Sequence, residues 1–186
     1  MPHDRTHIME RLSRGAQPPS RLSLVLFYAL SLSLAGVPAA PHVEAAGTSA
    51  PDFDLVTFSG EAYSKATLRG HPTLLVFWAP WCNVCRRELP LLSEYSQKEK
   101  PSKLKILSIG FADTRGNVDA FVKLHAGTFV FPTAYDDDRW VAQAFKINAT
   151  PTSIVLDEQG MIVLIHRGGG LLQNGRFRDF VSAFKK

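Results

Sequence analysis

Residues 77–90 read FWAPWCNVCRRELP and hold the only two cysteines of the 186-residue chain, Cys82 and Cys85. The run Thr73–Trp78 is almost wholly apolar and is typical of a buried central strand. A helix is expected to begin at Cys82. A cysteine pair at the junction of a strand and a helix is the arrangement that a dithiol needs to cycle through an intramolecular disulfide. The stretch therefore predicts a redox protein.

Other uses of a Cys-x-x-Cys pair fit this sequence less well. A structural disulfide that closes only two intervening residues removes little entropy from the unfolded chain. A zinc site needs four ligands, and no further Cys or His stands near the pair. Covalent haem attachment needs a histidine after the second cysteine, where this chain has Arg86. We therefore expect no metal and no cofactor beyond a redox-active disulfide between Cys82 and Cys85.

The first 46 residues have the layout of an export signal. Four arginines precede the apolar run 22–37, and small residues follow it. The run has about 16 residues, just under the roughly 17 to 25 that span a bilayer, so an uncleaved inner-membrane anchor is the alternative. Gly36 and Pro38 interrupt a helix there, which favours cleavage. In both cases residues 47–186 are expected outside the cytoplasm, in the periplasm or cell envelope.

Length and charge bear on the number of domains and on the class of binding partner. Residues 47–186 are enough for one domain with a substantial core. The formal net charge of the chain is +4, and four of its basic residues lie in the segment that export would remove. The charge therefore gives no reason to expect a nucleic-acid partner.

The pattern within residues 47–186 predicts alternating strands and helices. Residues 47–50 are interpreted as a linker, followed by a strand and turn and then a short helical turn before the buried strand. Pro90 is expected to kink the helix that begins at Cys82. The further predicted elements are a central strand at 104–110, a helix at 117–125, a helix capped by Asp138, a hairpin of strands 153–156 and 161–166, and a helix over 177–184. This alternation predicts parallel central pairing.

The order of elements resembles the thioredoxin fold across residues 73–186. The resemblance rests on Trp-Cys-x-x-Cys opening the first long helix, a proline eight residues after the first cysteine, and Thr-Pro before the hairpin. Four further features look like the TlpA/ResA-type branch of thiol-disulfide oxidoreductases. They are the N-terminal segment 50–70, the insertion at 117–131, the export signal and the motif CxxCRRELP. This resemblance implies an α/β fold of the thioredoxin-like type, in which helices flank a central mixed sheet that carries an N-terminal strand extension and a helical insertion.

The chemistry needs a thiolate that attacks and a second thiol that resolves the mixed disulfide. Cys82 is the expected attacker, because free N–H groups and the helix dipole lower the pKa of a thiol at a helix N-terminus. Cys85, one turn inward, is then the shielded resolving thiol. Asn83 and Val84 supply neither a positive charge nor a histidine between them, which argues against a strong oxidant.

Glu88 is the third predicted catalytic residue, because it lies one helical turn after Cys85. An anion there opposes thiolate formation, and the protonated carboxyl can exchange a proton with the pair. Ordinary thioredoxins carry a buried Asp six residues before the first cysteine, where this chain has Val76, and TlpA/ResA-type proteins carry a Glu at the position of Glu88. The alternative is a solvated acid without a role.

The resemblance also implies a substrate-binding surface. Pro151 matches the cis-proline that lies against the cysteines in this fold. Such a bend would leave the backbone of Thr150 free to pair with an extended substrate. Trp81 is expected to flank the pair as an apolar contact, and its alternative is a plain core residue.

The leading hypothesis is an exported enzyme that reduces disulfides in client proteins and is re-reduced by a membrane thiol electron donor. By resemblance, the client is an apocytochrome c in cytochrome c maturation or a copper-site assembly protein. An envelope disulfide donor stays open, since about 30 mV in the two-electron potential corresponds to only about 1.4 kcal/mol. A metallochaperone that holds Cu(I) between the two thiolates is the third hypothesis.

Overall fold

The computed structural model describes residues 47–99 and 103–184. The predicted export signal or anchor, including the run 22–37, lies outside the described residues. Within the described ranges, no helix is both long enough and apolar enough to cross a membrane.

Six strands form one mixed sheet, in the order β1-β8-β7-β4-β5-β6. Their bounds are β1 Thr48–Ser49, β4 Thr73–Trp78, β5 Lys105–Gly110, β6 Thr133–Tyr135, β7 Thr152–Leu156 and β8 Met161–Arg167. β4 pairs in parallel with β5 and antiparallel with β7, so it lies inside the sheet. β5 and β6 are parallel, whereas β8 is antiparallel to both β7 and β1. This mixed sheet confirms the predicted fold class.

β4 occupies the middle of the sheet because both of its faces are apolar. All six of its residues are buried. Leu75 and Phe77 belong to one hydrophobic core, and Val76 and Trp78 belong to the core on the opposite face. The sheet can therefore be covered on both sides.

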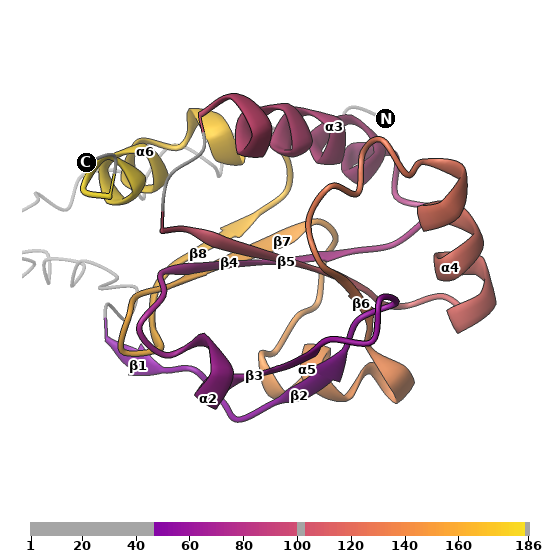
Figure 1. The fold of residues 1–186 in the computed structure, drawn as a ribbon, viewed down its shortest axis with the longest axis horizontal. Coiled ribbons are helices and arrows are strands. Elements are labelled where there is room, and N and C mark those ends of the chain that lie inside the picture. The colour runs from indigo at the N-terminus through magenta and orange to yellow at the C-terminus, as the bar shows by residue number, and fades with distance from the viewer. Residues whose placement is uncertain (1–46, 100–102, 185–186) are drawn as a thin grey trace, which may run out of the picture. The chain divides into compact units, whose positions relative to one another are not determined.

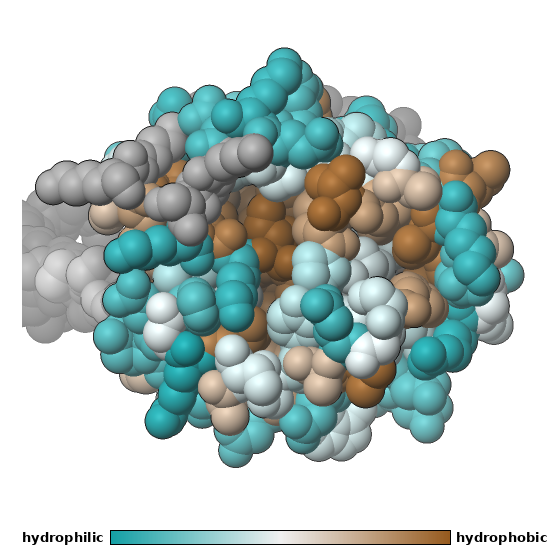
Figure 2. Space-filling model, viewed as in Figure 1, coloured by the Kyte–Doolittle hydropathy of each residue, from teal (hydrophilic) through white to brown (hydrophobic). Residues whose placement is uncertain are grey.

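Helices cover one face of the sheet and smaller elements cover the other (Figure 1). The first layer contains α3, Asn83–Lys98, and α6, Gly175–Ser182, with α4, Arg115–Leu124, beside β6. The second contains the hairpin of β2, Asp54–Val56, and β3, Ala62–Ser64, with α2, Lys65–Leu68, and α5, Trp140–Ala144. Short 3-10 turns, Asp137–Arg139 and Leu171–Gln173, precede α5 and α6. In the same view, apolar side chains are recessed between hydrophilic surfaces (Figure 2).

Besides β3, which pairs with the neighbouring β2, two short strands were not anticipated from the sequence. Residues 48–49, interpreted as linker, form β1 because Thr48 pairs with Ile162 of β8. β6 was also missed, since its three residues give too short a pattern, and it is defined by pairing with Ser108, Ile109 and Gly110 of β5. β1 and β6 therefore depend on partner strands that lie far away in the sequence.

Asp136, rather than Asp138, caps α5, which corrects the prediction. The Oδ1 atom of Asp136 accepts from Val141 N at 2.9 Å, and Oδ2 accepts from Ala142 N at 2.7 Å. Asp138 is exposed and has φ 49 within the 3-10 turn. Burial raises the pKa of Asp136, while the N–H donors act in the opposite direction by stabilising its anion.

Replacement of Asp136 tests this cap. Asp136→Ala is expected to lower the free energy of unfolding by about 1 to 3 kcal/mol, because two buried N–H groups lose their acceptor. Asp137→Ala, the control in the adjacent exposed position, should change it by less than about 0.5 kcal/mol. Urea unfolding followed by circular dichroism measures both variants, and equal effects would contradict the assignment.

Candidate active site

The two cysteines lie where β4 gives way to α3, as predicted. Cys82 is the N-cap of α3, and its Sγ accepts from Cys85 N at 3.1 Å. Cys82 and Cys85 form a disulfide with their Cα atoms 5.2 Å apart. The Cys85 N–H group that donates to Cys82 Sγ can therefore also stabilise a thiolate at Cys82 after reduction.

The exposure of the two cysteines differs in the predicted direction. Cys82 keeps 5% of its surface accessible and Cys85 keeps none. Cys82 is less open than expected of an attacking thiol, because the oxidised pair is packed among apolar neighbours. Of the two cysteines, Cys82 is the one that keeps any accessible surface in the oxidised form.

Cys85, Glu88 and Pro151 line one narrow hollow under the start of α3. Val76 of β4 and Gly168, which follows β8, also contribute to its wall. The hollow has a volume of about 20 Å³, which is room for about one water molecule. The structure thus brings Glu88 beside the resolving cysteine, with an apolar side chain at the position of Val76.

Glu88 is held by the glycine segment Gly168–Gly170 rather than left in solvent. Its Oε2 accepts from Gly170 N at 2.9 Å. A Cβ added to Gly169 would lie 2.8 Å from Glu88 Oε1 and 3.2 Å from Val84 Cγ1. Glycine at position 169 therefore permits the close approach of this segment to α3.

The same glycine segment also touches the proline. Gly168 N donates to Pro151 O at 2.8 Å. His166 Nε2 is 3.0 Å from Gly169 O, and its Nδ1 is 3.3 Å from the amide nitrogen of Asn174, the N-cap of α6. These contacts of His166 were not predicted. An isolated histidine gives no sequence signal for a role of this kind.

The Thr150–Pro151 peptide bond is cis, as the resemblance implied. Pro151 is buried and Thr150 is half-buried. Among the described residues, the backbone N–H and C=O groups of Thr150 have no hydrogen-bond partner. These groups are available to an extended chain that lies along this edge.

Trp81 is not a core residue, because 58% of its surface is exposed. Its Nε1 donates to Ala112 O at 3.0 Å, which fixes the indole beside the start of α3. Ala112 has φ 59, an uncommon value for a residue with a side chain. The contribution of Ala112 was not predicted, because nothing in the sequence marks the residue.

Arg86 secures the turn before α3 instead of facing the sulfur atoms. Its Nε donates to Pro80 O at 2.8 Å, and its guanidinium lies 5.4 Å from the ring centre of Phe121. Among the described residues, no three His, Cys, Asp or Glu side chains gather as a metal site requires. The cysteine pair is thus the remaining candidate for soft-metal ligation.

The fold and the Cys82-x-x-Cys85 pair define a thioredoxin-like thiol-disulfide oxidoreductase. A model of the AhpC/TSA family matches residues 46–165, and the chain belongs to that family. The thioredoxin-like protein YneN of Bacillus subtilis is 37% identical over 124 residues, which cover 66% of this chain and 71% of YneN. The thiol-disulfide oxidoreductase ResA of Geobacillus kaustophilus is 30% identical over 124 residues, or 67% and 70% of the two chains.

Solved structures share the fold. A thioredoxin-family thiol:disulfide interchange protein from Chlorobium tepidum superposes with a TM-score of 0.61 at 24% identity, covering 77% of this chain and 99% of that one. StoA from Bacillus subtilis gives a TM-score of 0.60 at 23% identity over 75% and 99% of the two chains.

Alkylation of the reduced protein tests the order of exposure. Iodoacetamide is expected to modify Cys82 at least about tenfold faster than Cys85, because only Cys82 reaches the surface and sits at the helix N-terminus. Peptide mass spectrometry after a short pulse measures the two rates. The urea-unfolded protein is the control and should show similar rates. Faster labelling of Cys85 in the folded protein would reverse the assigned roles.

Proposed function

We propose that this protein is an exported reductant of disulfides in client proteins, with Cys82 as the attacking thiol. The observation that carries the proposal is the placement of Cys82 at the N-cap of α3, with Cys85 sealed one turn inward. Trp81 supplies an exposed apolar contact next to it. Thr150 supplies free backbone groups for an extended client segment, beside the buried Pro151.

The reaction transfers two electrons to the client. The Cys82 thiolate attacks one sulfur of the client disulfide, the client S–S bond breaks, and the second client sulfur leaves and takes up a proton. The Cys85 thiolate then attacks Cys82 Sγ in the mixed disulfide. The first client sulfur leaves as a thiol, and the Cys82–Cys85 disulfide remains.

Glu88 is the proposed proton carrier for the second step. It shares the hollow with Cys85, and that hollow has room for about one water molecule. The carboxylate can therefore accept the proton that Cys85 must lose before it attacks. Gly170 N donates to the carboxylate and holds it at the hollow in the oxidised form.

The return to the dithiol form requires a reductant, and we assign this to a membrane thiol electron donor. One similar solved structure is described as a secreted Mycobacterium tuberculosis disulfide oxidoreductase, which supports a site of action outside the cytoplasm. The proposed clients are an apocytochrome c during cytochrome c maturation or a copper-site assembly protein. A redox titration of the protein decides the direction of electron flow, because a midpoint near about −120 mV would identify an oxidant instead.

Trapping with Cys85→Ser tests the exchange mechanism. The variant is expected to accumulate a covalent complex with its client through Cys82, because no second thiol remains to resolve the mixed disulfide. Non-reducing electrophoresis and mass spectrometry of the complex identify the client. Cys82→Ser is the matched control and should form no such complex. Equal adducts in both variants, or none in either, would contradict the proposed roles.

Glu88→Gln tests the proton carrier. The glutamine keeps an acceptor for Gly170 N but removes the negative charge, so the cysteine thiolate is expected to form at lower pH, by on the order of one unit. Thiolate absorbance against pH measures the shift. An unchanged titration would leave Glu88 with a structural role only, as the acceptor of Gly170 N.

Gly169→Ala is expected to shift the titration in the same direction, because the new methyl group would displace the Glu88 carboxylate. Gly175→Ala is the control, since a Cβ there would meet no atom within 4 Å. If Gly169→Ala leaves the titration unchanged while Glu88→Gln shifts it, the glycine segment does not position Glu88.

A further inference from the structure

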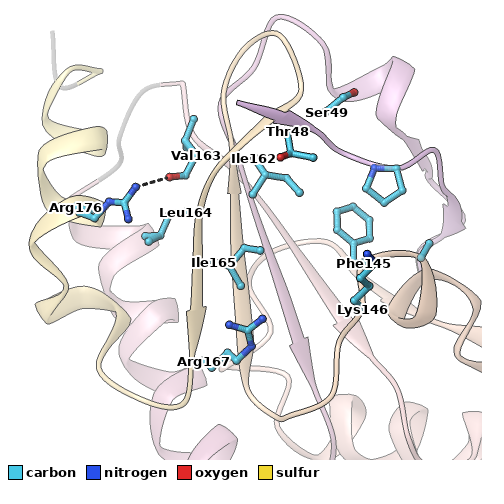
Figure 3. Close-up of a pocket in the computed structure, with 12 residues that line it drawn as sticks. Thr48, Ser49, Phe145, Lys146, Ile162, Val163, Leu164, Ile165, Arg167 and Arg176 are labelled. Atoms are coloured by element: carbon cyan, nitrogen blue, oxygen red, sulfur yellow. Dashed lines mark hydrogen bonds between the residues drawn. The ribbon is translucent and has the colours of Figure 1, made fainter. Parts of the chain in front are cut away.

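A groove of about 380 Å³ lies along β8, near the β1 edge of the sheet, and neither cysteine is among the residues that line it (Figure 3). Its floor follows β8 from Ile162 to Arg167. Phe145 and Lys146 border it on one side of the strand, and Arg176 of α6 lies on the other side. The groove therefore runs along the backbone of β8 rather than into the core.

β8 is only partly covered by its outer neighbour. β1 pairs with Met161 and Ile162, whereas β8 continues to Arg167. Among the described residues, no strand pairs with the outer side of Val163–Arg167. This leaves the edge of Val163–Arg167 without a strand partner in the described part of the chain, and only Val163 O accepts a hydrogen bond there, from Arg176.

The register of the sheet shows which backbone groups face outward. Gly168 N donates to Pro151 O across the pair Thr152–Arg167, so the N–H and C=O of Arg167 itself turn away from β7. Because these directions alternate along a strand, the backbone groups of Ile165 also face outward. They are spaced as an added antiparallel or parallel strand requires.

The groove is cationic at its edges and apolar in its middle. Lys146, Arg167 and Arg176 are exposed and contribute to its lining, and none of the described lining residues is acidic. Arg176 Nη2 lies 3.4 Å from Val163 O, which holds its guanidinium over the strand edge. Between the cations lie Phe145, Ile162 and Ile165. Such a surface is complementary to an extended segment that alternates apolar and acidic side chains.

We propose that the Val163–Arg167 edge is a docking site for an extended acidic segment of a partner protein, which adds as a strand beside β8. Backbone hydrogen bonds to Ile165 and Arg167 hold the segment, and the three cations select its charge. The Arg167 end adjoins Gly168, which lines the hollow beside Cys85. A partner bound here is held next to the redox site without covering Cys82. This proposal does not depend on the direction of electron flow.

The first test is binding of a fluorescent hexapeptide of alternating glutamate and valine to the full chain. We expect saturable binding, at least about tenfold tighter than that of the lysine–valine peptide, and weakened by added salt. Two further peptides carry N-methyl groups on alternate residues. In the first peptide the methyl groups block one hydrogen-bonding edge of the extended backbone, and in the second they block the opposite edge. Only one of the two should lose binding, because strand addition uses one edge of the peptide. Equal binding of all peptides, or binding of none, would overturn the proposal.

Charge reversal on α6 provides matched variants. Arg176→Glu is expected to weaken binding of the glutamate–valine peptide by about tenfold or more. Arg178→Glu lies on the same helix but outside the groove and should bind within about twofold of the parent chain. Insulin-disulfide reduction should be unchanged in both variants, which separates this outcome from failure of the proposed function. Equal weakening in both would show that only overall charge matters.

Amide hydrogen exchange measured by NMR locates the bound peptide. The peptide should slow exchange at Ile165 and Arg167, whose N–H groups face outward, and leave Leu164 and His166 unchanged. Binding without this protection would overturn strand addition. Protection of Ile165 and Arg167 in the free chain would also overturn the proposal. If that protection grows with protein concentration, a second copy occupies the edge, and if it does not, the chain's own N-terminal segment does.

Discussion

The burial of β4 on both faces is the constraint on which the rest of the structure depends. A strand with two apolar faces is stable only when elements cover each side, and the two cores meet that requirement with α3 and α6 on one face and with α5 and the β2–β3 hairpin on the other. The end of this strand is therefore fixed at the centre of the protein. Three residues separate this strand from Cys82, so the reactive sulfur is positioned by a well-packed strand end.

Two chain segments meet the start of α3 beside the cysteines, and both come from the C-terminal half of the chain. The cis peptide before Pro151 brings the start of β7 to the cysteines, and the glycine segment after β8 brings backbone N–H groups to Glu88 and Pro151. The candidate site is thus assembled where β4 ends, β7 begins and β8 ends. Few side chains are charged there, which is compatible with chemistry in which the sulfur atoms carry the electrons.

The parts that the sequence predicted are those with a local signature. Thr73–Trp78 is continuously apolar, and the Cys-x-x-Cys pair stands at a helix start, so the central strand, α3 and the order of cysteine exposure could be anticipated. The cis bond before Pro151 was anticipated from family resemblance alone.

The parts that could not be predicted depend on distant partners. β1 and β6 exist through pairing with β8 and β5, and the Gly170–Glu88 hydrogen bond joins residues 82 positions apart. Asp136 and Asp138 are equivalent in local sequence, and only the path of the chain into α5 decides which carboxylate meets the free N–H groups.

The double attachment of the glycine segment couples two events that are chemically separate. Gly168 N holds the carbonyl of the proline against which a client would lie, and Gly170 N, two residues later, holds the carboxylate beside the inner sulfur. A displacement of that proline by an arriving peptide would therefore act on a segment that also holds the acid. Contact with a client and proton loss at the inner cysteine would then share one short stretch of backbone.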